Sequence, residues 1–227
     1  MTTLELIKIS NYFQMAGSLA ITASCLSYFN ERTFNFRILG LYALASLIFS
    51  MAQVLSGLFF SYSGVNEIGN ASVLSEILFF ALFFFYTTKS VRFEKGVFIS
   101  AVIYVVFYVI ALLFYEDRSY SFIRFGRDTL MIFYALAYFY YLIKKLPEEN
   151  LLKFPMFWIN SAIIFYFSGT VILSLFRDYI VTVLKNDTSG FLVFRNFFRF
   201  VFCLVLSYAG WLDLRLRTKS SSSRVNL

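Results

Sequence analysis

The sequence predicts an all-α membrane protein in which seven helices cross the bilayer, and three observations lead to this fold class. Apolar residue types make up 59% of the 227 residues, while charged types make up only 15%, against about 25% in soluble domains. The apolar residues gather in runs close to the roughly 20 residues that a helix needs to cross a bilayer. These runs lack the strict alternation of barrel strands, so we expect helices that satisfy their own backbone groups in lipid.

Seven stretches have the length and composition of such spans. In chain order they cover residues 9–29, 38–60, 73–88, 97–115, 129–143, 157–176 and 191–211. The third and fifth are the shortest and carry charges at their outer ends, Glu76 in the third and Arg127 with Asp128 in the fifth. The connections are short. We therefore expect one transmembrane domain over residues 1–213 and a short, basic, disordered cytoplasmic tail over residues 214–227.

Prolines lie outside the interior of every span. Pro147 falls in a connection and Pro155 precedes the sixth span, so no proline kinks or breaks a helix. Transporters often build their site from discontinuous helices near the middle of the membrane. The uninterrupted spans therefore argue modestly against alternating access.

The distribution of basic residues predicts the orientation. With the N-terminus outside, 12 of the 20 Lys and Arg residues fall on inner segments and six on outer ones, and the remaining two, Arg195 and Arg199, lie within the last span. Cytoplasmic segments of membrane proteins carry the excess of Lys and Arg. The bias predicts an outer N-terminus and a cytoplasmic C-terminus in a multi-pass protein of the cell (inner) membrane.

Composition also excludes several classes of function. The chain has no His, which excludes a His general base, a His-containing catalytic triad and any His-ligated metal or haem. Both cysteines, Cys25 and Cys203, sit in apolar runs, where a thiol behaves as a small hydrophobe. The net charge of +7 is too dispersed for a nucleic-acid surface. We expect no cofactor, no metal and no nucleic-acid partner.

An internal repeat would relate the two halves of the chain. With an offset of 116 residues, residues 45–49 align with residues 161–165, and Phe60 aligns with Phe176. The pattern suggests a 3+1+3 arrangement of parallel repeats, which some transporters have. In its topology alone, the chain resembles the broad group of PQ-loop transporters, microbial opsins and seven-helix receptors. It departs from their motifs, since Gln53 follows Ala52 rather than a proline and span 191–211 has no lysine for a retinal.

Three ionisable residues lie within spans, where charges are costly and tend to face the bundle interior. They are Glu76 in the third span and Arg195 and Arg199 in the seventh, the two arginines being four residues apart on one helical face. The rise of a helix places Glu76 roughly 5 Å, Arg195 roughly 6 Å and Arg199 roughly 12 Å from the outer ends of their spans. Other polar residues reach similar depths, and with these three they form the candidate ligand site: Asn11, Gln14, Gln53, Asp128, Tyr134 and Tyr138.

Two interpretations of this set remain open. In one, Glu76 pairs with Arg195 as a structural bridge, Arg199 extends towards the membrane surface or bonds backbone carbonyls, and the tyrosines are ordinary packing or interfacial residues. In the other, the two arginines exceed Glu76 by one positive charge, and a guanidinium in that position suits a carboxylate or phosphate. The second interpretation predicts an anion-binding pocket in the outer half.

We expect a non-enzymatic receptor or sensor that binds a small anionic or amphiphilic ligand and signals through a cytoplasmic or membrane protein partner. A small-solute transporter of PQ-loop-like architecture is the alternative, favoured by the possible repeat. A third hypothesis is an intramembrane enzyme that acts on lipids with Glu76 or Asp128 as its acid or base.

Overall fold

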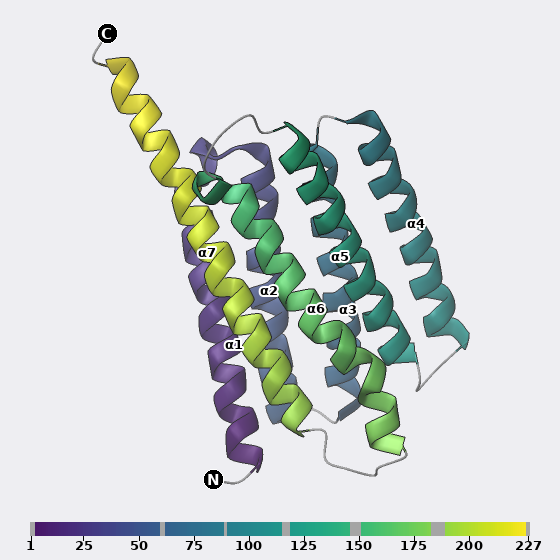
Figure 1. The fold of residues 1–227 in the computed structure, drawn as a ribbon. Coiled ribbons are helices and arrows are strands. Elements are labelled where there is room, and N and C mark those ends of the chain that lie inside the picture. Colours follow the sequence, from purple (N-terminus) through teal and green to yellow (C-terminus); the bar gives the residue numbers. More distant parts are fainter. Residues whose placement is uncertain are drawn as a thin grey trace.

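The computed structural model describes residues 3–59, 62–88, 90–114, 119–145, 151–182 and 189–225, and in these ranges the chain is all-α, with no strand. Two short 3-10 helices, η1 (Phe29–Glu31) and η2 (Leu151–Lys153), lie in the connections. The structure confirms the predicted fold class, because the long helices pack side by side as one bundle (Figure 1). Those helices are α1 (Thr3–Leu26), α2 (Phe34–Phe59), α3 (Tyr62–Thr87), α4 (Val91–Phe114), α5 (Ser119–Lys145), α6 (Pro155–Thr182) and α7 (Ser189–Val225).

Among the described residues, five helices are long and apolar enough to cross a membrane, namely α2, α3, α4, α6 and α7. The other two long helices, α1 and α5, contain more polar positions. Asn11 and Gln14 interrupt α1, while α5 carries Arg124, Arg127 and Asp128 in its first half. Both helices still lie within the bundle beside the five apolar ones (Figure 1). The chain is a multi-pass membrane protein.

Helix ends differ from the predicted span ends because helices continue into polar sequence. The helix α3 begins at Tyr62 and α5 at Ser119, about three turns before the predicted spans 73–88 and 129–143. A backbone helix needs its own hydrogen bonds rather than apolar side chains, so it extends beyond the stretch that hydropathy detects. The consequence is that residues near the predicted ends of these spans lie well inside the bundle.

The last helix also continues past its predicted end. It runs to Val225, through most of the segment 214–227 for which the sequence predicts disorder. Arg217 pairs with Asp213 one turn earlier at 3.4 Å, and the Arg215 guanidinium lies over the Trp211 ring. Such contacts at helical spacing stabilise the extra turns. Figure 1 shows this end of α7 extending beyond the other helices.

Helices α1 and α7 make the most extensive helix–helix contact in the bundle, and glycines allow their close approach. A Cβ atom at Gly17 would lie 3.1 Å from the Cβ of Cys203, and one at Gly210 would lie 3.2 Å from the Cys25 sulfur. Small residues at such interfaces let membrane helices pack backbone to backbone. The two cysteines therefore serve as small packing groups, buried and without a disulfide.

A buried arginine joins α1 and α7 at the end of the helix pair that is distant from the N-terminus. After α1 the chain turns at Tyr28, which adopts a left-handed conformation with φ of 56°. Arg32 follows and is buried, donating hydrogen bonds to the carbonyls of Ser24, Ser27 and Gly210. The last carbonyls of a helix have no partner within it. Arg32 supplies partners for those of α1 and ties them to α7.

Aromatic side chains fill the centre of the bundle. Phe80, Phe83, Phe84, Phe167 and Phe202 are all fully buried, and Tyr166 stacks on Phe202 with ring centroids 4.8 Å apart. Helix α4 lies at the edge of the bundle (Figure 1), packs on α3 and α5, and exposes an apolar face. In a membrane protein such a face is solvated by lipid tails.

Candidate functional site

The early start of α3 and α5 brings four charged residues to one depth in the bundle. Glu76 lies eight residues from Ile68, where the apolar part of α3 begins, and Arg199 lies nine residues from the corresponding Gly190 of α7. At about 1.5 Å per residue, both are roughly 12–14 Å inside their spans. Arg127 and Asp128 lie eight and nine residues from the start of α5. All four are far from the ends of their helices.

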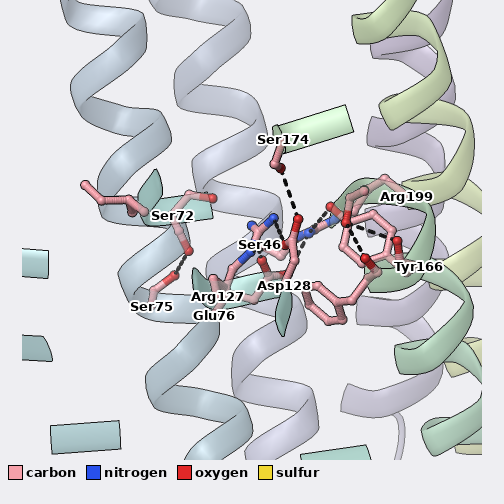
Figure 2. Close-up of polar contacts among 12 residues, drawn as sticks. Ser46, Ser72, Ser75, Glu76, Arg127, Asp128, Tyr166, Ser174 and Arg199 are labelled. Carbon is pink, nitrogen blue, oxygen red and sulfur yellow. Dashed lines mark hydrogen bonds and ion pairs between the residues drawn. The ribbon is translucent and has the colours of Figure 1, made fainter. Parts of the chain in front are cut away.

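These four residues form a network of ion pairs that joins α3, α5 and α7. Glu76 receives the Arg199 guanidinium on Oε1 at 2.6 Å and the Arg127 guanidinium on Oε2 at 2.7 Å. Arg127 also forms two hydrogen bonds with Oδ1 of its neighbour Asp128. Figure 2 shows the four side chains pointing towards one another, Glu76 from α3, Arg127 and Asp128 from α5, and Arg199 from α7.

Hydroxyl groups extend the network to α2 and α6. Tyr42 donates to Oε1 of Glu76 at 2.8 Å, and Arg199 donates to the Ser46 hydroxyl at 2.8 Å. On the α6 side, Ser174 donates to Oδ2 of Asp128 at 3.1 Å and Tyr166 accepts from Arg199 at 3.4 Å. Five helices therefore contribute side chains, which fixes the register of each helix against the others.

Aromatic rings enclose the two guanidinium groups. The Arg127 guanidinium carbon lies 5.3 Å from the centroid of Phe167, and that of Arg199 lies 5.5 Å from Tyr166 and 5.9 Å from Phe202. Cations positioned over aromatic faces are stabilised most where water is excluded. The rings therefore stabilise the two guanidinium charges, which lie far from either membrane surface.

The network is electrically balanced. Its two carboxylates, Glu76 and Asp128, are 2% and 0% exposed, and they face two guanidiniums, Arg127 and Arg199. The sequence analysis counted Arg195 and Arg199 against Glu76; the structure adds Arg127 and Asp128, and within these four residues Glu76 and Asp128 balance Arg127 and Arg199. The partner of Glu76 on α7 is also Arg199, whereas the sequence interpretation paired Glu76 with Arg195. The early start of α3 explains the difference, since it moves Glu76 about one turn deeper.

A cavity of about 220 Å³ lies beside the network; we call it the arginine cavity. Its walls come from the N-terminal parts of α1, α3, α5 and α7 and from the C-terminal parts of α2 and α6, so it lies in the half of the bundle that holds the N-terminus. Hydroxyl and amide groups line it, and no Asp or Glu occurs among its described lining residues. Four arginines line it: Arg124, Arg127, Arg195 and Arg199.

One buried donor next to the cavity lacks a partner among the residues that the structure describes. The Nε of Arg199 is buried and has no hydrogen-bond partner in the described part of the chain. Buried polar groups in proteins nearly always have a partner, which is often water or a ligand where the protein supplies none. Because Arg199 lines the cavity, a small polar occupant could complete its hydrogen bonding.

The structure gathers most of the residues predicted as the ligand site. Gln14, Gln53, Arg195 and Arg199 line the arginine cavity. Glu76 and Asp128 contact lining arginines through the ion pairs. Asn11 lines a smaller adjoining cavity of about 150 Å³ and accepts a hydrogen bond from Asn196 at 2.8 Å.

Tyr134 and Tyr138 lie elsewhere, so their predicted place in the cavity wall needs correction. Neither tyrosine is among the residues that line the two cavities. The Tyr134 hydroxyl lies 2.8 Å from the Ser100 hydroxyl on α4, and both tyrosine rings pack against Phe84 of α3. The two tyrosines therefore contribute to the packing of α3, α4 and α5. Packing between helices is the more common role of a row of aromatic residues on a membrane helix.

Sequence reasoning missed several residues of the site. Arg124 and Arg127 are not among the predicted site residues, because the predicted span 129–143 starts after them. The apolar residues Phe122, Ile123 and Phe125 that surround them are the signal that the helix begins earlier. Tyr42 and Asn196 also lie in apolar runs and carried no separate signal.

The described residues contain no group of three or more His, Cys, Asp or Glu side chains that could hold a metal ion. Fold and site together define a multi-pass, all-α membrane protein with a buried ion-pair network beside an arginine-rich cavity. Comparison with protein-family models, curated proteins and solved structures found no match to the chain.

Proposed function

We propose that the protein is a non-enzymatic membrane receptor that binds a small anion in the arginine cavity. The observation that carries the proposal is the presence of four arginines, with no described acidic residue, in the wall of one cavity inside a membrane bundle. Arginine has five N–H donors, so a guanidinium that already contacts a protein carboxylate retains donors for a ligand. Carboxylates and phosphates match this donor geometry.

The size of the cavity limits the ligand. A volume of about 220 Å³ is below the roughly 300–1,000 Å³ of sites for drug-sized molecules. The occupant is therefore a small anion or the head group of an amphiphile. With the predicted orientation the cavity faces the outside, and the excess of basic residues on the inner segments favours a protein partner there for signalling.

Anion binding is tested by thermal unfolding of the purified protein in phosphatidylcholine nanodiscs, titrated with inorganic phosphate or acetate. A bound anion raises the unfolding free energy by RT ln(1 + [L]/Kd), about 2.7 kcal/mol at 100 times Kd. We expect Arg195→Gln to weaken binding at least tenfold, because Arg195 lines both cavities and is outside the Glu76 ion pairs.

Arg92→Gln is the matched control, since it removes the same charge at an exposed position in the first turn of α4. Its stabilisation by anions should equal that of the wild type. If neither anion stabilises the wild type, or if Arg92→Gln and Arg195→Gln behave alike, the arginine cavity is not an anion site. Native mass spectrometry of the gently purified protein would add the mass of any anion retained from the cell.

Transport of a small solute is the competing proposal, supported by the possible repeat at an offset of 116 residues in the sequence. A receptor binds its anion without moving it, whereas a transporter accumulates it inside sealed vesicles. Uptake of radiolabelled phosphate and acetate into proteoliposomes therefore separates the two. Uptake that is lost in Arg195→Gln and retained in Arg92→Gln would replace the receptor proposal by transport.

A further inference from the structure

A second cavity adjoins the arginine cavity and shares six of its own eight described lining residues with it. It encloses about 150 Å³ between α1, α2 and α7, and it shares Gln14, Gln53 and Asn196 with the arginine cavity. Asn11 and Val54 line only this smaller cavity. Arg195, Ser50 and Leu192 also line both cavities.

Carboxamides account for four of the eight described residues that line the second cavity, which we call the amide cavity. Asn11, Gln14, Gln53 and Asn196 line it together with Ser50. Polar side chains are uncommon in membrane helices and usually bond across helix interfaces or line polar cavities. Four carboxamides from three helices at one place exceed what a single interhelical hydrogen bond requires.

Contacts among the described residues use only part of the hydrogen-bonding capacity of Asn11, Gln14 and Asn196. Asn196 donates to the Ser10 hydroxyl at 3.0 Å and to Oδ1 of Asn11 at 2.8 Å, and Gln14 donates to Ser50 over a long 3.4 Å. A carboxamide offers two donors and an oxygen with two lone pairs. The group is therefore suited to pairing with hydroxyls, which both donate and accept.

We infer that the ligand is a hydroxylated organic anion, an inference that rests on the proposed function. Its phosphate or carboxylate contacts the arginines, and its hydroxyl groups lie in the amide cavity. A bare inorganic anion would contact the arginines alone. An apolar tail in the amide cavity would add no hydrogen bond to those that Asn11, Gln14 and Asn196 already make, and covering their remaining polar groups would cost binding free energy. An anion with hydroxyl groups on a chain of about three carbons could place its charge at the arginines and its hydroxyls beside the carboxamides.

Two pairs of probes test the inference in phosphatidylcholine nanodiscs. Glycerol 3-phosphate is compared with propyl phosphate, and glycerate with propionate, so that each pair differs in its hydroxyl groups. We expect the wild type to bind the hydroxylated member of at least one pair about tenfold more tightly. The variants Asn11→Leu and Val54→Phe should lose this preference while keeping their affinity for the unhydroxylated member.

The two variants act differently on the amide cavity. Asn11→Leu removes a carboxamide, whereas Val54→Phe fills space and leaves the Asn11–Asn196 contact in place. Ile103→Phe, on the exposed face of α4, is the control and should keep the preference. Arg195→Gln should weaken both members of a pair.

The outcomes separate this inference from the proposed function. Equal binding of both members, still dependent on Arg195, would overturn the hydroxylated ligand and leave the anion receptor standing. Binding of no probe would overturn both. A preference that survives in both amide-cavity variants would also overturn the inference. If the preference disappears in phosphatidylglycerol nanodiscs, a hydroxylated lipid head group occupies the site; if it persists there, the ligand is a soluble anion.

Discussion

Glu76 accepts hydrogen bonds from three side chains on three different helices, Tyr42 of α2, Arg127 of α5 and Arg199 of α7. Removing one partner from a buried ion pair is more costly than never having the pair, because the remaining charge stays buried. Without Glu76, two guanidiniums would face Asp128 alone at the centre of the bundle. The stability of the bundle therefore depends on this carboxylate more than on any exposed one.

We predict that Glu76→Gln lowers the free energy of unfolding by roughly 3 kcal/mol, measured by chemical or thermal unfolding in detergent. Glu94→Gln, the same change in the first turn of α4, should have little effect. The double variant Glu76→Gln/Arg199→Gln restores the charge balance, so its loss should be smaller than the sum of the single losses. Additive losses would show that the Glu76–Arg199 pair contributes no coupling energy.

At the scale of helices, the packing of α6 on α7 is set by one glycine. A Cβ atom at Gly169 would lie 2.7 Å from the ring of Phe198, closer than such atoms approach in proteins. The same Phe198 ring packs on Phe165 of α6, with centroids 5.2 Å apart. Any side chain at Gly169 must therefore displace a ring that already has a partner.

We predict that Gly169→Ala destabilises the protein by about 1–3 kcal/mol through overpacking. Gly96→Ala is the matched control, because a Cβ atom there meets nothing within 4 Å, and alanine favours a helix over glycine. Phe198→Leu should recover part of the loss in the Gly169→Ala background. Unfolding midpoints of the four proteins test this, and equal midpoints for the two alanine variants would contradict it.

The sequence predicts the existence of the helices better than their ends. The errors in the helix ends led to errors in the predicted site. Apolar runs located all seven long helices, and intramembrane charge identified Glu76 and Arg199. The depth of each residue was measured from where apolar sequence begins, whereas α3 and α5 begin about three turns earlier. Because of that shift, the sequence pairs Glu76 with Arg195 instead of Arg199 and does not include Arg127 in the site. Tyr134 was misplaced for another reason, since spacing gives a helical face but not the neighbour it meets.

At the scale of the whole molecule, the function depends on which side of the membrane the cavities open to. Both lie in the half of the bundle with the N-terminus, and α7 carries the chain to the opposite end (Figure 1). The two-to-one excess of Lys and Arg on the segments of that opposite end predicts a cytoplasmic C-terminus. The proposed receptor for an external anion requires this orientation.

We predict that a membrane-impermeant maleimide labels Thr2→Cys in intact cells and labels Ser222→Cys only after permeabilisation. The native Cys25 and Cys203 are buried, so they contribute little background, and permeabilised cells should label both variants equally. The reverse pattern would place the arginine cavity on the cytoplasmic side. Anion binding could then still occur, but the ligand would be an intracellular one, and the partner that receives the signal would have to be sought at the opposite face. Labelling thus decides in which compartment a hydroxylated anion is to be sought.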